Sequence, residues 1–317
     1  MAKKINRRSF IKGSAAAGVS SFFIGRALRS EQTFAQEIPA VETERRISIA
    51  QGDDYYANAV KAVEQFGGIG RFVLKGAKVA LLPNAQRNNP GTFTKPEIVR
   101  AVIKMCRDAG ASEVNVISCL QLDRWKAAGL EQAIIESGGK LVLTDLRDET
   151  QFKTVSIPKG IALKEAKIMA EYFKYDVFIN LPITKDHLGN RFTGTLKNMM
   201  GLNFYQSNRA FHTGLFESKP DNIDHLDQCI ADLNTVIKPH LCIVDATEFI
   251  TTNGPFGPGD IIKPKKVICG TDRVAIDSYC CALWGLKPQE IVMITKAAEH
   301  GLGEMDLSKI KLIEAAA

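Results

Sequence analysis

The chain has 317 residues, of which 45% are hydrophobic and 24% are charged, proportions typical of a globular protein, and its formal net charge is +6. This excess charge lies wholly in the first 35 residues, which hold seven basic residues and one acidic residue, so that residues 36–317 hold 34 of each and are neutral. A neutral chain without a basic stripe excludes nucleic acid as an expected partner.

The first 35 residues resemble a twin-arginine export signal. Arg7 and Arg8 follow a basic start, and the weakly apolar run at 13–25 is too short to span a bilayer. Small residues near Ala35 suit cleavage there. We therefore expect a signal peptide at residues 1–35, followed by a domain at residues 36–317. The twin-arginine machinery would carry this domain to the periplasm or otherwise export it. We expect no stable membrane anchor after cleavage. The alternative for the first segment is a basic amphipathic tail.

Hydrophobic periodicity predicts strands that alternate with helices along residues 36–317. The expected strands cover residues 46–52, 77–84, 113–119, 140–146, 176–183, 240–247 and 265–272. The expected helices cover residues 59–66, 94–111, 123–137, 162–173, 226–237 and 272–285. This alternation predicts an α/β fold with a mainly parallel sheet or sheets flanked by helices, in one domain or in two lobes. The periodicity weakens over residues 146–163, which we interpret as a crossover or hinge.

Polar residues near helix starts admit two interpretations. Thr94 and Glu97 have the spacing of a capping box before the helix at 94–111. Asp272 and Asp277 are expected to contact a substrate, but Asp272 also suits a helix cap. Asp277 lies one turn from Arg273 and also suits a structural ion pair.

Polar side chains follow several of the predicted strands directly. In open α/β sheets, ligands bind outside the carboxyl ends of the strands, where loops lead into helices. The residues in such positions are Asn84, Arg87, Lys185, His187, Asp245 and Asp272. We expect these side chains to converge on one binding or catalytic site.

The stretch KDHLGNRFTGTLKNMMG, residues 185–201, is the strongest candidate for that site. Lys185 and His187 directly follow an apolar strand and can present an ammonium and an imidazole to one anion. Farther on come Thr193, Gly194, Lys197 and Asn198, and a glycine there lets backbone approach a ligand closely. A lysine beside a second cation loses basicity and can act as a nucleophile or base. The alternative is a solvated loop.

The sequence names no cofactor. None of the seven cysteines lies in a C-x-x-C pair, so no iron–sulfur or zinc-ribbon motif is present. The five histidines lack the spacing of H-E-x-x-H. A metal site stays open as an alternative, because His187, His212 and an aspartate can meet in space. No G-x-G-x-x-G, P-loop or G-x-S-x-G motif is present.

Together these stretches resemble the domain-of-unknown-function 362 family. The resemblance rests on VALLPNAQ, TKPEIVRAVIKMCRDAGASEV, the stretch at 185–201, IADLNTVIKPHLCIVDAT, NGPFGPG, GTDRVAIDSYCCALWG and AAEHGLGEMD. It covers nearly all of residues 36–317. The positions that the resemblance carries over are Lys185, His187, Thr193, Gly194, Lys197, Asn198, His212, Asp232, Asp245, Asp272 and Asp277.

The family resemblance implies no activity. Many relatives carry an added ferredoxin-type segment, which this chain lacks. Relatives also often have a lysine before the Pro-Asn pair, where this chain has Leu82. If that lysine binds an anion, this protein has lost the contact or supplies it with Arg87.

The leading hypothesis is an exported enzyme that acts on a small anionic molecule, such as a carboxylate or a phosphorylated compound. Lys185, Lys197 and Arg87 would neutralise the anion. His187 or His212 would move a proton, and Asp245 would orient a base or hold a metal. Asn84, Thr193, Gly194 and Asn198 would bind the substrate. The alternative is a periplasmic ligand-binding or accessory protein of a redox or maturation system.

Overall fold

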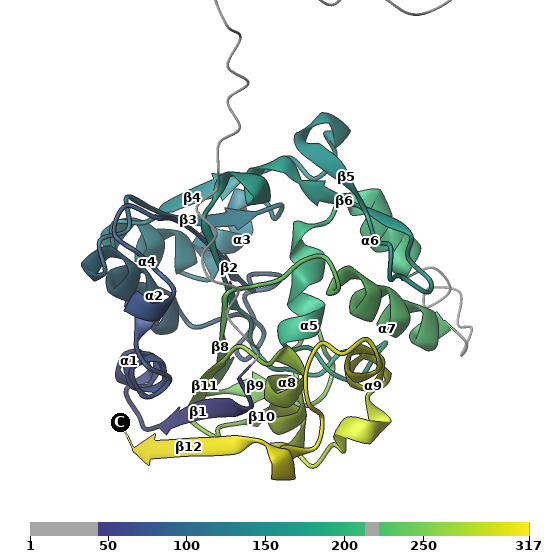
Figure 1. Cartoon of the computed structure of the whole chain (residues 1–317). Coiled ribbons are helices and arrows are strands. Elements are labelled where there is room, and N and C mark those ends of the chain that lie inside the picture. Colours follow the sequence, from purple (N-terminus) through teal and green to yellow (C-terminus); the bar gives the residue numbers. More distant parts are fainter. Residues whose placement is uncertain (1–43, 213–221, 317) are drawn as a thin grey trace, which may run out of the picture. The chain divides into compact units, whose positions relative to one another are not determined.

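An eight-stranded sheet runs through the part of the chain that the structure describes (Figure 1). The computed structural model describes residues 44–212 and 222–316, so the proposed export signal lies outside the described residues. In order across the sheet, the strands are β12 (Lys311–Ala316), β1 (Arg46–Gln51), β11 (Lys266–Gly270), β8 (Leu241–Ala246), β7 (Val177–Leu181), β2 (Lys78–Pro83), β3 (Glu113–Ser118) and β4 (Lys140–Leu143).

The sheet is mainly parallel. Five of its seven neighbouring strand pairs are parallel. The two exceptions both involve β11, which runs antiparallel to β1 and to β8. This arrangement confirms the predicted α/β fold. The described residues fall in one compact unit, so among them no second lobe is present.

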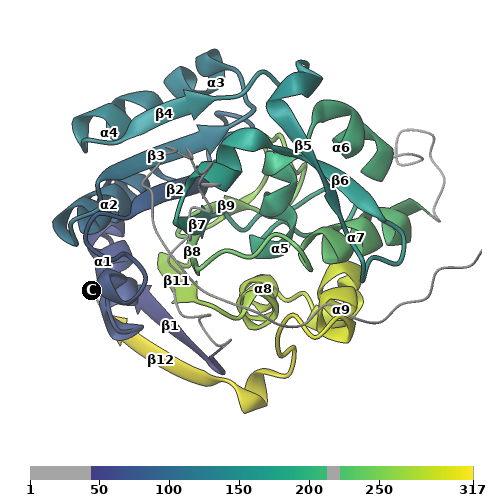
Figure 2. The ribbon, with the colours of Figure 1, turned by 45° about the horizontal axis from the view of Figure 1, so that its top comes forward.

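Helices cover both faces of the sheet because the buried strands carry apolar residues on both sides (Figure 2). In β2, Val79 and Leu81 pack on one face and Ala80 and Leu82 on the other. The first face is covered by α1 (Tyr55–Gln65), α2 (Pro96–Asp108) and α4 (Leu130–Glu136). The second face is covered by α5 (Thr195–Asn198), α7 (Asn222–Leu233), α8 (Arg273–Ala282) and α9 (Val292–Glu299).

The connections after β2 and β7 diverge to opposite faces of the sheet. The chain leaves β2 through α2, on the first face, and enters β3. It leaves β7 through α5 and α7, on the second face, and enters β8. Because β2 and β7 are parallel neighbours, their carboxyl ends form a topological switch point, which is where α/β sheets bind ligands.

Residues 162–173 do not form the predicted helix. They contain β6 (Glu165–Met169), which pairs antiparallel with β5 (Phe152–Ser156), and the start of a 3-10 turn at Ala170–Lys174. Ala166 and Ile168 face the core, with a period of two. Burial of that strand face outweighs the helix propensity of the alanine, leucine and lysine residues. The predicted hinge at 146–163 includes β5.

Two further local predictions were wrong. The single helix predicted at 123–137 is two helices, α3 (Leu122–Ala127) and α4, because Gly129 between them adopts a left-handed conformation with φ of 68°. The capping box before α2 does not form. Thr94 Oγ1 donates to Leu181 O at 2.7 Å, and the backbone N–H of Lys95, the N-cap residue, donates to Asp245 Oδ2 at 2.8 Å.

No helix within residues 44–212 and 222–316 is long and apolar enough to cross a membrane. The seven cysteines are buried free thiols, so the described fold holds together without disulfides.

Candidate functional site

Lys185 lies directly beyond β7 at the switch point, and its side chain is fully buried. Its backbone exchanges two hydrogen bonds with Thr193, which folds the following segment back onto it. Its Nζ donates to Thr92 O at 2.6 Å and to Asn84 Oδ1 at 3.2 Å, both in the loop after β2. Lys185 therefore joins the two diverging loops.

The Lys185 ammonium is weakly basic. Burial, followed by the charges of Lys197 and Arg87, lowers the pKa of Lys185 to about 7. A substantial fraction of Lys185 is therefore neutral near pH 7, which an ordinary lysine is not.

Three asparagines behind Lys185 form a polar chain, of which Asn180 and Asn198 are buried. Asn84 Nδ2 donates to Asn198 Oδ1 at 3.1 Å, and Asn198 Nδ2 donates to Asn180 Oδ1 at 2.8 Å and to Leu82 O at 2.9 Å. Asn180 Nδ2 in turn donates to Thr195 O at 3.0 Å. Asn84 and Asn198, both predicted to bind substrate, thus fix the position of Lys185 relative to α5.

Lys197 is the second cation of the site and lies on α5. The start of this short helix is held by Asp277, whose carboxylate accepts the N–H of Thr195 at 2.6 Å and that of Leu196 at 3.0 Å. Position 194 requires glycine, because the Cβ of any other residue would overlap Asp277 Oδ1. The close approach predicted for this glycine is therefore to the carboxylate of Asp277.

Asp227 of α7 is the acidic partner of Lys197, and sequence analysis missed it. Burial lowers the pKa of Lys197, and the charge of Asp227 opposes this effect. Burial likewise raises the pKa of Asp227, against the effect of Lys197. Asp227 is buried and accepts the N–H of Met293 at 3.0 Å. A signal was present in the sequence, since Asp227 shares the buried face of its predicted helix with Ile230 and Ala231.

His187 and His212 lie side by side, with ring centroids 6.2 Å apart. Burial and then Lys197 lower the pKa of both imidazoles, to about 4 for His212 and well below the ordinary value for His187. His212 extends beyond α6 (Tyr205–Phe211) as its C-cap residue. Both rings are therefore neutral at pH 7.

The hydrogen bonds of the two imidazoles assign opposite tautomers. His187 Nδ1 accepts the N–H of Gly189 at 3.1 Å, so its ring proton is on Nε2. His212 Nδ1 lies 2.7 Å from Asn208 O, and a carbonyl can only accept, so its ring proton is on Nδ1 and its lone pair on Nε2. The two neutral rings therefore hold their protons on different nitrogens. We call Lys185, His187, Lys197 and His212 the lysine–histidine cluster.

Two buried oxygens in the 185–201 segment add to the polarity of the cluster. Within the described residues, Asn190 Oδ1 and Thr193 Oγ1 have no hydrogen-bond partner. Such groups usually pair with protein, water or ligand when they are buried. The 185–201 segment therefore contains hydrogen-bonding groups that the fold around it leaves without partners.

The other predicted aspartates hold backbone groups. Asp245 accepts the N–H groups of Thr247 and Lys95, and Asp272 accepts those of Ala275 and Glu304. The structure does not bring either carboxylate into the lysine–histidine cluster by a hydrogen bond. Their proposed contacts with substrate or metal stay predictions.

Asp277 also caps a helix, in place of the predicted ion pair with Arg273. The Arg273 guanidinium donates to Asn234 Oδ1 at 2.6 Å and to the carbonyls of Asn234 and Ile237. Asp277 is occupied by the start of α5. A role of Asp277 in substrate binding is therefore indirect, through the position of Lys197.

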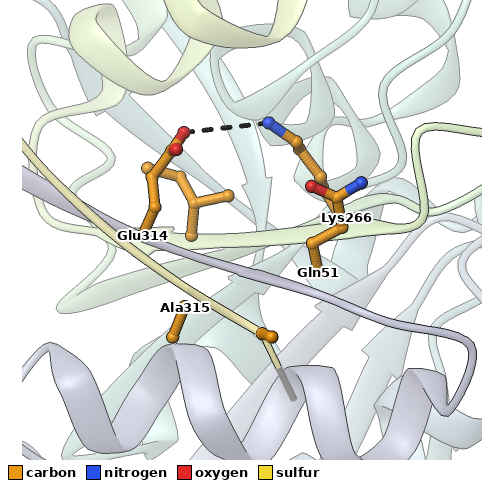
Figure 3. Close-up of a pocket in the computed structure, with 6 residues that line it drawn as sticks. Gln51, Lys266, Glu314 and Ala315 are labelled. Atoms are coloured by element: carbon orange, nitrogen blue, oxygen red, sulfur yellow. Dashed lines mark ion pairs between the residues drawn. The ribbon is translucent and has the colours of Figure 1, made fainter.

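A cavity of about 500 Å³ beside β1, β11 and β12 lies apart from the cluster, since β8 separates these strands from β7. Its charged groups are paired, with Lys266 Nζ 3.7 Å from Glu314 Oε1 (Figure 3). Lys266 also donates to the Tyr279 hydroxyl at 2.8 Å. Because its cation and anion neutralise each other, this cavity offers a ligand little net charge.

Metal ligands do not gather in the part of the chain that the structure describes. There, no group of three or more histidine, cysteine, aspartate or glutamate side chains is arranged to hold a metal ion. The chemistry available at the switch point is that of two weakly basic lysines and two neutral imidazoles.

Fold and site together define an α/β protein with a largely buried cluster of two lysines and two histidines at the switch point of a mainly parallel sheet. Residues 79–282 match the family described as domain of unknown function DUF362, and the chain belongs to this family. The family resemblance of the sequence motifs is thereby confirmed.

A named relative is the thylakoid-associated protein sll1697 of Synechocystis sp. It is 27% identical over 270 residues, which cover 82% of this chain and 80% of that protein.

Two solved structures are similar at low identity. The lactate racemase apoprotein of Thermoanaerobacterium thermosaccharolyticum is 15% identical with a TM-score of 0.48 over 74% of this chain, and a protein of Thermotoga maritima is 12% identical with a TM-score of 0.44 over 79%. The chain spans 57% and 60% of the lengths of those two proteins.

Proposed function

We propose that this protein is an enzyme that binds a small anion at Lys185 and Lys197 and transfers protons through His187 and His212. The observation that carries the proposal is the pair of adjacent neutral imidazoles with opposite tautomers. A neutral imidazole can accept a proton as a base, and a second neutral imidazole can donate a hydrogen bond to the charge that the proton leaves behind.

The anionic character of the substrate follows from the charge balance. The charges of Lys197 and Arg87 both lower the pKa of Lys185, and Asp227 is the carboxylate that acts on Lys197. Cations that lower one another's basicity are stabilised by an added anion, which favours their charged forms. Anion binding near pH 7 should therefore take up protons. A carboxylate or phosphate group fits this requirement.

The two imidazoles would take different parts in the proton transfer. His212 would take a proton from the substrate and return it at another position, and His187 would donate a hydrogen bond from its Nε2–H to the negative charge that develops. This division suits an isomerisation or elimination at a carbon next to a carboxylate, since such reactions remove one proton and deliver another. The lysine charges would stabilise the negative charge that develops on the carboxylate.

We also propose that the enzyme works outside the cytoplasm. The support is the paired Arg7 and Arg8, the short apolar run and the small residues near Ala35. The neutral charge of residues 36–317 agrees with a signal that is removed after it has served.

Hydrogen exchange into candidate substrates tests the catalytic proposal. We would incubate the protein in D₂O with small hydroxy and unsaturated carboxylates and follow loss of C–H signals by NMR. The wild type should exchange at least one of them, and His187→Gln and His212→Gln should slow the exchange about 10²–10⁴-fold while anion affinity changes less than about threefold.

The matched control is His225→Gln, which removes an exposed imidazole on α7 and should leave exchange unchanged. If the two cluster variants instead lose anion affinity and the wild type exchanges nothing, the protein is a ligand-binding protein and the catalytic proposal fails.

A further inference from the structure

A second polar cavity lies beside the loop that follows β2. Its volume is about 260 Å³, and it opens between the loop after β2 and the loop after β3 with helix α3, into which that second loop leads. Both loops leave the carboxyl ends of parallel strands, the edge where such sheets bind ligands. The polar side chains that line the cavity are Gln86, Arg87, Asn88, Gln121, Asp123 and Arg124.

The cavity carries two guanidinium groups without carboxylate partners in the described structure. Arg124 Nη1 donates to Gln86 O at 3.0 Å, and Arg87 lies over the ring of Phe256, 4.3 Å from its centroid. Asp123 also lines the cavity, with its Oδ1 accepting the backbone N–H of Arg124 at 3.0 Å. Two cations against one carboxylate leave the cavity with net positive charge.

One short stretch of chain connects this cavity to the cluster. Asn84 Oδ1 accepts from Lys185 Nζ, and Gln86 O, two residues later, accepts from Arg124 Nη1. The acceptors of Lys185 and Arg124 are thus two residues apart in one loop, which holds both cations at the same edge of the sheet. Arg87 acts on both, since its charge lowers the pKa of Lys185 and that of Arg124.

We propose that the substrate of this protein is a small dianion, with one acidic group at Lys185 and Lys197 and a second acidic group in the cavity of Arg87 and Arg124. This inference rests on the proposed function and narrows its substrate class. Guanidinium groups bind carboxylate and phosphate through two parallel hydrogen bonds, which suits an oxyanion at the end of a short spacer. Short dicarboxylates and phosphorylated carboxylates belong to this class.

Calorimetric titration with matched anions tests the inference. The probes are acetate, malonate, succinate, glutarate and phosphoglycolate. In the wild type, the best dianion should bind at least about 30-fold more tightly than acetate, since a charge-assisted pair contributes about 2 kcal/mol. Arg124→Gln should reduce this advantage to within about threefold, with acetate affinity unchanged.

Two further variants keep the test independent of folding. Lys126→Gln removes the same charge from an exposed position of α3 outside the cavity and should leave every affinity unchanged. Asp123→Asn removes the carboxylate that lines the cavity and should tighten dianion binding several-fold without affecting acetate.

The outcomes separate this inference from the proposed function. If acetate binding requires Lys185 but no dianion exceeds acetate, or if the advantage survives in Arg124→Gln, the dianion inference is overturned and the anion site stands. If Lys185→Met leaves acetate and dianion binding intact, the proposed function is wrong about the lysines. Loss of both affinities in Lys185→Met, with only the dianion advantage lost in Arg124→Gln, supports both.

Discussion

Lys185 carries the electrostatics of the site at the scale of one residue. A fully buried lysine is rare, because removing an ammonium from water costs several kcal/mol that two oxygen acceptors repay in part. This buried ammonium lies at the switch point of the sheet. Such placement is expected for a group that serves function, because burial is what brings its pKa to about 7.

Replacing Lys185 by methionine should therefore separate stability from binding. Lys185→Met removes the buried charge and keeps the volume, so we expect the free energy of unfolding at pH 7 to rise by about 1–3 kcal/mol. Anion affinity should fall at least about tenfold. Urea unfolding and calorimetric titration measure the two effects, and Lys174→Met, at an exposed surface lysine, is the control.

The contribution of Lys185 to the free energy of unfolding depends on pH in a definite direction. The unfolded chain protonates Lys185 near 10.5 and the folded chain near 7, so the unfolded state binds more protons between these values. Stability from this residue is therefore complete at high pH and falls as pH decreases toward 7. The wild type should lose stability relative to Lys185→Met over this range. A variant that is less stable than the wild type at pH 7 would contradict the account.

The sequence predicts the site residues that follow strands better than those that lie inside helices. Lys185 and His187 could be found because they directly follow an apolar strand. Asp227 and Arg124 were missed because each lies inside a predicted helix, where a charged side chain usually faces solvent. The tertiary fold brings Asp227 near enough for its charge to act on Lys197.

At the scale of the element, α5 depends on one carboxylate from another helix. This helix has four residues and little stability of its own, so the bonds from Asp277 of α8 to Thr195 and Leu196 define where it begins. The position of Lys197 follows from that contact.

Gly194→Ala tests this dependence. Its Cβ would overlap the Asp277 carboxylate, so we expect a loss of about 2–4 kcal/mol in the free energy of unfolding and a weaker anion site. Gly201→Ala is the matched control in the same segment, because its Cβ would meet Leu82 Cδ1 at an ordinary 3.6 Å. Equal stability of the two variants, measured by urea unfolding, would refute the role of this cap.

The elements that sequence patterns could predict are those of the central parallel strands. The apolar runs of β2, β3, β7 and β8 mark buried strands, whatever their partners. β6 was misassigned because its alanine and lysine residues favour a helix in isolation. β12 was not predicted, because it is largely exposed and exists through pairing with β1, more than 250 positions away in the chain.

At the scale of the whole molecule, the export proposal predicts a dependence on the paired arginines. Replacing Arg7 and Arg8 by lysine keeps the charge and removes the feature that the twin-arginine machinery reads. We expect the double variant to stay in the cytoplasm with an uncleaved N-terminus. Cell fractionation with mass spectrometry of the N-terminus measures both. Export and cleavage as in the wild type would contradict the proposal.

The arrangement of the whole sheet is what brings the residues of the lysine–histidine cluster together. β2 and β7 are about 100 residues apart in the chain, yet their parallel pairing places the loop of Asn84 and Thr92 against the loop of Lys185. His212, from the end of α6, then meets His187. Sequence analysis expected convergence at strand ends, but the tautomers follow only from the three-dimensional hydrogen bonds.

The most direct measurement is a long-range ¹H–¹⁵N NMR spectrum of the histidine rings at pH 7, assigned with His187→Gln and His212→Gln. The account predicts two neutral rings, His187 with its proton on Nε2 and His212 with its proton on Nδ1, neither of which titrates between pH 6 and 8. A charged ring at pH 7, or the same tautomer in both rings, would contradict the acid–base pair at the centre of the proposed function.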